Sequence, residues 1–342
     1  MNKLNHRQNI LITGGAGFIG SHLVNYLIKK GHRITILDNL ERGSLDNIPI
    51  SSSIVKSTED WVTHDSDNLN FVNCDLRSYE SFKKFFKNQN IVIHLASKVG
   101  GIGTYLSKPY EILSSNICID SNVLKAVLEN KIKKYFYASS AHVYPKELQA
   151  SSDALPMAED KAYPANPELT YGWAKLMGEK AIESSLKENP WLQASIARFI
   201  GIYGPNQDFN FETGSVIPVF CHRALRYPDV EFKAWGTGKE TRSYCYINDT
   251  LECIEKMINQ NKSLTGPYNV GSEIRISISE IANLVKEISG KDIEVKWDTS
   301  KETVIWGQVC DCSLVEKELS WKASTKLKQG LKSVYTDILS KI

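Results

Sequence analysis

A glycine-rich turn between an apolar run and an amphipathic segment constrains the fold of this chain more than any other feature. The sequence predicts a strand over 9–13, a turn over 14–20, a helix over 21–28 and a second strand over 33–38. Glycines at such a turn let the backbone approach a pyrophosphate closely, and the helix N-terminus offers its N–H groups to the anion. The pattern therefore predicts a βαβ unit that binds a dinucleotide. The alternative, a glycine-rich turn that holds no ligand, remains open.

The second predicted strand ends in an acidic residue, Asp38. A carboxylate at this place accepts a hydrogen bond from a ribose 2′-hydroxyl and repels a 2′-phosphate. The expected cofactor is therefore NAD rather than NADP, although the positive charge of Arg42 nearby weakens the preference.

The chain continues with alternating strands and helices. Further strands are expected over 69–74, 91–96, 134–139 and 194–199. This alternation predicts an α/β fold of the Rossmann type, a doubly wound parallel sheet.

The pattern is less regular elsewhere. Residues 44–68 are polar and turn-rich, which favours a surface insertion, and beyond Pro205 a smaller C-terminal α/β domain is expected. We expect the NAD-binding domain to comprise 1–203 and 241–263, and the substrate domain to comprise 204–240 and 264–342.

Composition excludes several classes of protein. A net charge of +2 gives no electrostatic footprint for nucleic acid. No stretch approaches the ~18 apolar residues of a membrane span, and no apolar signal-peptide core precedes the first strand. The seven scattered cysteines are typical of reduced thiols in a cytoplasmic protein. Cys310 and Cys312 lack a second Cys or His pair at ligand spacing, so no metal site is expected.

Tyr171 and Lys175 lie one helical turn apart, on one face of a predicted helix. A nearby ammonium favours the phenolate, so the pKa of Tyr171 is expected to fall from ~10 towards neutrality. Such a tyrosine takes a proton from a sugar hydroxyl while a cofactor takes the hydride. Ser140, at the end of the strand over 134–139, is placed to bind the same hydroxyl. Alternatively, Ser139 and Ser140 only cap the following turn.

The chain resembles the extended short-chain dehydrogenase/reductase family of NAD-dependent nucleotide-sugar epimerases and dehydratases. The resemblance rests on 14–20, Asp38-Asn39, Asp75-Leu76, 94–96, Asn116, Ser139-Ser140, Tyr171 with Lys175, 203–205, Arg242 and 269–271. Within the family, the segments 98–103, 137–141 and 241–244 most resemble GDP-mannose 3,5-epimerases, followed by GDP-fucose synthases.

The resemblance implies the residues of an active site. The catalytic set is Ser140, Tyr171 and Lys175, with His142 at a position where relatives carry a functional residue. The cofactor-binding set is Gly14, Gly17, Phe18, Ile19, Gly20, Asp38, Asn39, Asp75, Leu76, Leu95, Ala96, Lys98, Asn116, Tyr171 and Lys175. The substrate-binding set is Gly100, Gly101, Ser140, Ser215, Val216, Arg242 and Trp306, in which Arg242 would grip the diphosphate.

Several positions depart from the relatives' pattern: Gly201 replaces an asparagine, Trp306 and Gln308 lie in a region where relatives carry an arginine, and three further departures affect acid/base positions. His142 stands where 3,5-epimerases carry a cysteine, 4,6-dehydratases a glutamate and 4-epimerases a threonine; it is expected to titrate near neutral pH and to exchange a proton at carbon. A binding or packing role for His142 is the alternative. Ser215 and Val216 replace a histidine and a lysine, so the relatives' second acid/base is missing.

The resemblance implies transient oxidation of a nucleotide-diphosphate sugar at C4 to a 4-keto sugar. The expected net reaction is epimerisation or dehydration of the sugar, for example 3,5- or 4-epimerisation of a GDP-hexose. The alternatives are a net C4 dehydrogenase or 4-keto reductase and, in another class, a non-catalytic NAD-binding protein. A homodimer through the helices that carry Asn116 and Tyr171 is implied as well.

Overall fold

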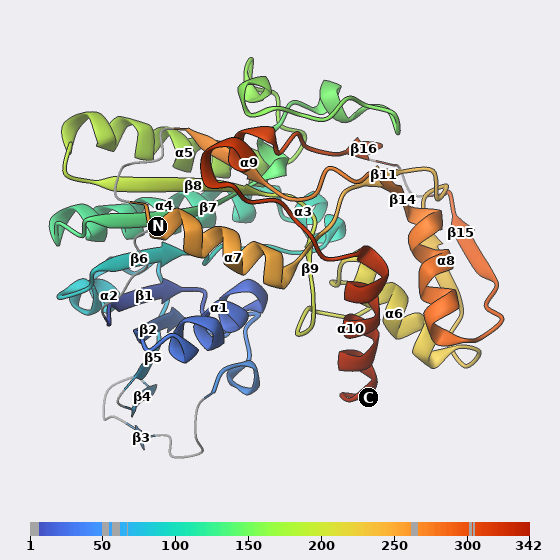
Figure 1. Cartoon of the computed structure of the whole chain (residues 1–342), viewed down its shortest axis with the longest axis horizontal. Helices are drawn as coiled ribbons and strands as arrows, with labels where there is room; N and C mark the ends of the chain where they lie inside the picture. Colours follow the sequence, from blue (N-terminus) through green and yellow to red (C-terminus); the bar gives the residue numbers. More distant parts are fainter. Residues whose placement is uncertain are drawn as a thin grey trace.

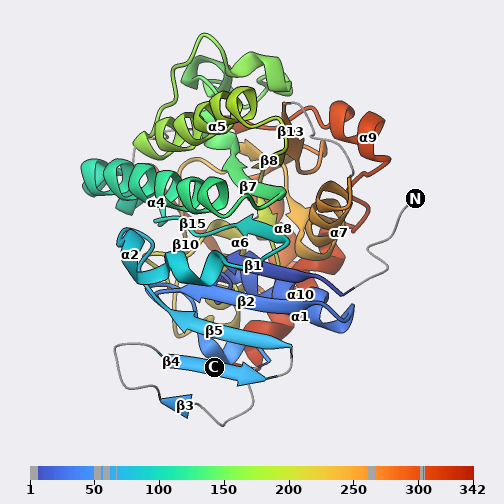
Figure 2. The same ribbon diagram turned by 90° about the vertical axis from the view of Figure 1, so that its left-hand side faces the viewer.

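A nine-stranded sheet runs through the centre of the molecule (Figures 1 and 2). The computed structural model describes residues 7–49, 55–56, 62–66, 68–260, 266–300, 303 and 305–342. From one edge to the other the strands are β13 (Pro267–Val270), β8 (Gln193–Phe199), β7 (Lys134–Ser140), β6 (Ile91–His94), β1 (Asn9–Thr13), β2 (Arg33–Asp38), β5 (Leu69–Asn73), β4 (Val62–Ser66) and β3 (Val55–Lys56). The strands from β13 to β5 pair in parallel, whereas β4 and β3 are antiparallel.

Helices cover both faces of this sheet, which confirms the doubly wound α/β prediction. Side chains of β1 alternate between two cores, with Ile10 and Ile12 in one and Leu11 in the other. The first core contains α1 (Phe18–Lys29) and α7 (Ile247–Ile258), and the second contains α4 (Pro109–Glu129) and α5 (Thr170–Glu188). Figure 2 shows α4 and α5 side by side on their face of the sheet.

A second, smaller α/β part has a core of its own and lies beside the sheet (Figure 1). Its main elements are α6 (Val216–Arg226), β10 (Phe232–Trp235), α8 (Ile278–Ser289), β15 (Val295–Asp298) and α10 (Leu327–Leu339). Short strands join the two parts: β9 (Ile202–Tyr203), β11 (Thr241–Arg242), β12 (Cys245–Tyr246), β14 (Ile276–Ser277) and β16 (Gly307–Gln308). The remaining helices are α2 (Tyr79–Phe82), α3 (Ile102–Ser107) and α9 (Ser313–Leu319).

The helix expected over 21–28 spans Phe18–Lys29, and two larger details also differ from the expected boundaries. The predicted surface insertion 44–68 includes β4, which pairs with β5 and extends the sheet; its residues 50–54, 57–61 and 67 lie outside the described residues. Strand β13 forms an edge of the large sheet although it follows the expected domain boundary at 263. We therefore propose that the NAD-binding domain extends to about residue 271. No helix in the described part of the chain is long and apolar enough to cross a membrane.

Candidate active site

A cavity of about 470 Å³ opens at the carboxyl ends of the central strands, the edge where ligands bind in such sheets. Most residues with a predicted role line it: Gly14, Gly17, Phe18, Ile19, Gly20, Asp38, Asn39, Asp75, Leu76, Leu95, Ala96, Lys98, Gly100, Gly101, Ser140, Tyr171, Lys175 and Ser215. The described residues Asn116, His142, Val216, Arg242 and Trp306 are not part of its lining. The cavity is therefore mainly the predicted cofactor site.

The glycine-rich turn packs so closely against neighbouring backbone that a side chain would not fit at two of its glycines. Gly14 has φ +71°, and a Cβ added there would lie 2.7 Å from the backbone N of Ala96. A Cβ on Gly20 would lie 2.1 Å from the carbonyl oxygen of Gly14. Gly17 precedes α1, and no side chain caps the N-terminus of that helix. Because the first N–H groups of a helix attract anions, this cradle fits the pyrophosphate of a dinucleotide.

Asp38 is held by the backbone beside this turn. Its Oδ2 accepts a hydrogen bond from the N–H of Ala16 at 3.0 Å, and its Oδ1 accepts one from the N–H of Leu40 at 2.9 Å. Burial raises the pKa of Asp38, and the two hydrogen bonds oppose that rise. The carboxylate is thus fixed at the end of β2, where a ribose hydroxyl is expected.

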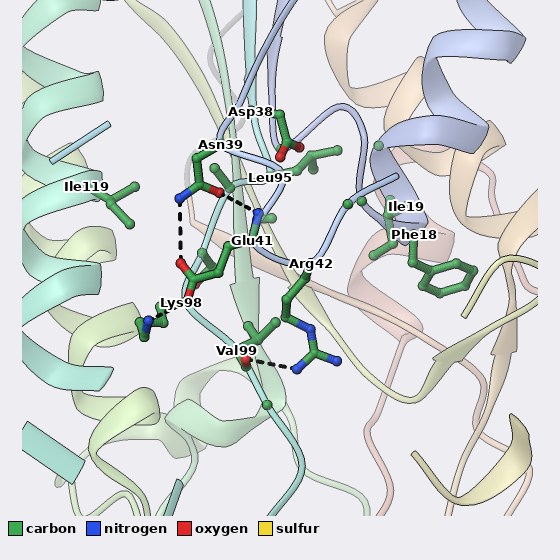
Figure 3. A pocket seen from close by; sticks show the side chains of 18 of the residues that line it. Phe18, Ile19, Asp38, Asn39, Glu41, Arg42, Leu95, Lys98, Val99 and Ile119 are labelled. Carbon is green, nitrogen blue, oxygen red and sulfur yellow. Dashed lines mark hydrogen bonds and ion pairs between the residues drawn. The ribbon is translucent and has the colours of Figure 1, made fainter. Parts of the chain in front are cut away.

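Arg42, whose charge weakened the NAD prediction, is engaged elsewhere. Its guanidinium donates to the carbonyl oxygen of Val99 at 3.0 Å and pairs with Asp208 at 2.9 Å. Figure 3 shows the guanidinium of Arg42 pointing towards Val99. The carboxylate of Asp208 neutralises this cation, so Arg42 offers less attraction to a 2′-phosphate than its sequence position suggested.

Asn116 supports the cavity wall from α4. Its Oδ1 accepts hydrogen bonds from the hydroxyl of Ser97 at 2.6 Å and the N–H of Lys98 at 2.8 Å, and its Nδ2 donates to the carbonyl oxygen of Lys98 at 3.0 Å. Lys98 in turn pairs with Glu111 at 2.9 Å and with Glu41, as Figure 3 shows for Glu41. The loop after β6 is therefore tied to α4 by the amide of Asn116 and by the ion pair between Lys98 and Glu111.

Tyr171 lies on the buried face of α5, where its ring belongs to an aromatic cluster. Its ring stacks on Tyr105, with centroids 5.3 Å apart, and meets the ring of His142 edge-on at 5.7 Å. Burial raises the pKa of Tyr171, and side-chain hydrogen bonds with Ser97 and Ser140 oppose that rise. The Ser140 hydroxyl also accepts a hydrogen bond from the N–H of His142 at 3.2 Å and so caps the turn over 141–143. Its role at a substrate hydroxyl stays a prediction.

The expected lowering of the Tyr171 pKa by Lys175 is wrong for the protein alone. Lys175 Nζ lies 5.9 Å from the centroid of the Tyr171 ring and 3.8 Å from Oδ1 of Asp120. The ammonium is thus closer to a buried carboxylate than to the phenol ring. Desolvation is therefore the largest influence on the pKa of Tyr171, as expected for a phenol that is buried among other rings.

His142 does not titrate near neutral pH, contrary to expectation. Burial lowers its pKa to about 4, and the positive charge of Arg242 acts in the same direction. The imidazole is therefore neutral at pH 7, which removes a role as a proton donor but leaves a role as a base.

Arg242 lies in β11 and Trp306 directly precedes β16, and neither lines the cavity. The guanidinium of Arg242 donates to the carbonyl oxygens of Thr241 at 2.8 Å and Ile305 at 2.9 Å. These bonds hold the β11–β16 region together. The side chain of Trp306 is partly buried, and its backbone N–H donates to Gln149 at 2.9 Å. Ser215 precedes α6 and Val216 begins it.

Sequence reasoning missed three residues beside Tyr171. Ser97 bonds to both Tyr171 and Asn116, Tyr105 stacks on Tyr171, and Asp120 pairs with Lys175. The spacing of Asp120, one turn after Asn116 on the same helix, is the signal that could have found it.

The chain is similar to known proteins over nearly its whole length. The family model described as NAD-dependent epimerase/dehydratase matches residues 10–271. The chain is 31% identical over 330 residues to GDP-mannose 3,5-epimerase 1 of Oryza sativa subsp. indica, covering 96% of this chain and 81% of that protein. It is 32% identical over 327 residues to GDP-mannose 3,5-epimerase of Arabidopsis thaliana, covering 95% and 81%. A crystal structure of UDP-glucose 4-epimerase with UDP-glucose from Thermotoga maritima matches with a TM-score of 0.83 and 25% identity, covering 97% of this chain and 99% of that one.

Proposed function

This chain belongs to the NAD-dependent epimerase/dehydratase family, and we propose that it epimerises a nucleoside-diphosphate hexose through transient oxidation at C4. The observation that carries the proposal is the position of Tyr171, which lies in the wall of the glycine-rich cavity together with Ser140 and Lys175. GDP-mannose is the first substrate to test, because two similar proteins are named for it.

NAD is proposed to lie along the glycine-rich turn, with its adenosine ribose at Asp38 and its nicotinamide end near Tyr171 and Lys175. When bound, it supplies the acceptor and later the donor of a hydride. Tyr171 takes the proton of the C4 hydroxyl, and Ser140 positions that hydroxyl by a hydrogen bond. Tyr171 must lose its own proton before this step, and burial makes that loss harder. The nearby positive charge of Lys175 favours the phenolate and so assists the deprotonation.

His142 is proposed to act on the 4-keto sugar. The ketone acidifies the hydrogens at C3 and C5, and a neutral imidazole accepts such a proton while the electron pair passes to the C4 oxygen of an enolate. Water then supplies the proton that returns to the carbon, because the relatives' second acid/base is missing here. Because burial lowers the pKa of His142 to about 4, the neutral form prevails at every pH above that value. Proton exchange that depends on His142 should therefore persist in mildly acidic solution.

Incubation with GDP-mannose in deuterated water tests this step. We expect solvent deuterium at C3 or C5 of the recovered sugar, measured by mass spectrometry and proton NMR. His142→Phe should abolish the incorporation while the protein still oxidises C4, and His222→Phe, at a histidine packed against Phe209 and Phe211, should leave it unchanged.

Other outcomes of this experiment lead to different functions. A C4 epimer without deuterium excludes the proposed role of His142 and leaves a 4-epimerase. Stoichiometric conversion of added cofactor identifies a net C4 dehydrogenase or 4-keto reductase. Absence of any chemistry with a panel of nucleotide sugars, in protein that retains NAD, supports a non-catalytic NAD-binding protein.

We propose a homodimer through α4 and α5, as the family resemblance implies. Apolar side chains that are exposed on these helices support it: Tyr110, Ile117, Trp173 and Met177. The double variant Ile117→Glu/Met177→Glu is expected to be a monomer by analytical ultracentrifugation, because like charges would replace apolar contacts. Leu339→Glu, at an exposed leucine of α10, should remain dimeric. A wild-type monomer at micromolar concentration would contradict the proposal.

A further inference from the structure

A buried carboxylate lies behind the Tyr171–Lys175 pair and has no role in the chemistry proposed above. Asp120 projects from α4, and its Oδ1 lies 3.0 Å from His94 Nε2 and 3.8 Å from Lys175 Nζ. Its Oδ2 accepts a hydrogen bond from the hydroxyl of Tyr137 at 2.5 Å. Side chains from β6, β7 and α5 thus converge on one carboxylate from α4.

The hydrogen bonds of this cluster define its charges. Thr13 Oγ1 accepts a bond from the N–H of Ala96 at 3.3 Å and lies 2.6 Å from His94 Nδ1. If the Thr13 hydroxyl donates to Nδ1, a neutral His94 carries its proton on Nε2 and donates it to Asp120. Burial lowers the pKa of His94, in agreement with a neutral ring. Asp120 is then an anion that accepts two hydrogen bonds, and Lys175 is the cation beside it.

This anion affects both members of the proposed catalytic pair. Burial lowers the pKa of Lys175, and the charge of Asp120 opposes that change. The same charge contributes to the raised pKa of Tyr171. The titratable groups that face Asp120 and Lys175 from the surrounding elements are His94 from β6, Tyr135 and Tyr137 from β7, and Tyr171 and Glu179 from α5.

We propose that Asp120 is a positioning residue that keeps Lys175 protonated and holds its ammonium between the rings of Tyr137 and Tyr171. The distances from Lys175 Nζ to these two ring centroids are 4.7 Å and 5.9 Å. The inference rests on the proposed function, because it explains how the charge that assists Tyr171 survives burial. A bare ammonium in this site would otherwise lose its proton.

The pH dependence of kcat distinguishes this role from simple packing. In Asp120→Asn the ammonium of Lys175 loses its counter-ion and deprotonates at lower pH. The alkaline limb of the kcat profile, which this deprotonation sets, therefore moves to lower pH. The phenol of Tyr171 loses a nearby negative charge, so the acid limb moves to lower pH as well. We expect the whole profile to shift down by about one pH unit or more. Asp120→Glu keeps the charge and should keep the position of the profile, although it crowds the core. A profile that only loses height in Asp120→Asn would overturn the proposal.

A second measurement needs no substrate. Carbon-13 NMR of lysines labelled at Cε, in the NAD-loaded protein, follows the titration of Lys175, whose signal is identified by its loss in Lys175→Met. Lys175 should deprotonate at lower pH in Asp120→Asn than in the wild type. An unchanged titration refutes the role of Asp120 even if the enzyme acts on the expected sugar, and a shifted one supports it even if the sugar is wrong. If Asp120→Asn does not fold, Asp120→Ser carries the same expectations.

Discussion

Tyr171→Phe is expected to lower kcat by about 10²–10⁴-fold, because the variant keeps the ring but loses the group that exchanges the hydroxyl proton. The cofactor should stay bound, since the glycine-rich turn and Asp38 are untouched. Steady-state kinetics with the best nucleotide sugar, together with the NAD content of the purified protein, measure both quantities.

Tyr105→Phe is the matched control for this variant. Tyr105 stacks on Tyr171 and is similarly buried, so it undergoes the same chemical change within the same cluster. A much smaller loss of kcat is expected, because the ring contacts survive. If the two variants lost kcat equally, the loss would come from removing a buried hydroxyl in this cluster. That result would refute an acid/base role that is specific to Tyr171.

Glu179→Ala is expected to destabilise the fold by about 3–5 kcal/mol. The carboxylate of Glu179 accepts bonds from Arg198 Nε at 2.9 Å and Arg198 Nη2 at 2.7 Å, and both side chains are buried. Its removal leaves the guanidinium in the interior without a counter-ion. The loss is measured as the change in the free energy of unfolding by urea denaturation. Ser139, the neighbour of Ser140, donates a hydrogen bond to Glu179, so its side chain should change position in the same variant.

Two variants make this prediction specific. Glu183→Ala removes an exposed carboxylate one turn further along α5, which pairs with Lys180 at 2.7 Å, and should cost no more than about 1 kcal/mol. The double variant Glu179→Ala/Arg198→Met removes both charges and should recover much of the stability. If Glu179→Ala cost as little as Glu183→Ala, the buried pair would not be the source of stability proposed for it.

Local patterns predicted the strands and the cofactor cavity well. The central strands of the sheet are continuous apolar runs, so 9–13 and 33–38 were found with their observed bounds. The glycine spacing and Asp38 likewise define a turn whose geometry is local. Strand β4 was missed because its segment is polar and turn-rich, and its pairing with β5 depends on a contact outside the segment.

The electrostatics of the site could not be predicted in this way. Spacing correctly put Lys175 on the same helix face as Tyr171, but the nearest charge to Lys175 comes from Asp120 on another helix. Likewise, the sequence alone led us to expect that His142 titrates like an ordinary histidine. In the fold, burial and the charge of Arg242 lower its pKa. Side-chain pKa values depend on burial and on distant partners, which only the tertiary structure supplies.

Turnover of a nucleotide sugar labelled with deuterium at C4 tests the central claim most directly. The proposed mechanism removes a hydride from C4 and returns it, so the labelled substrate should react more slowly and the product should retain its deuterium at C4. Equal rates for labelled and unlabelled substrate, with the label lost to water, would mean that C4 exchanges a proton rather than a hydride and would contradict the mechanism.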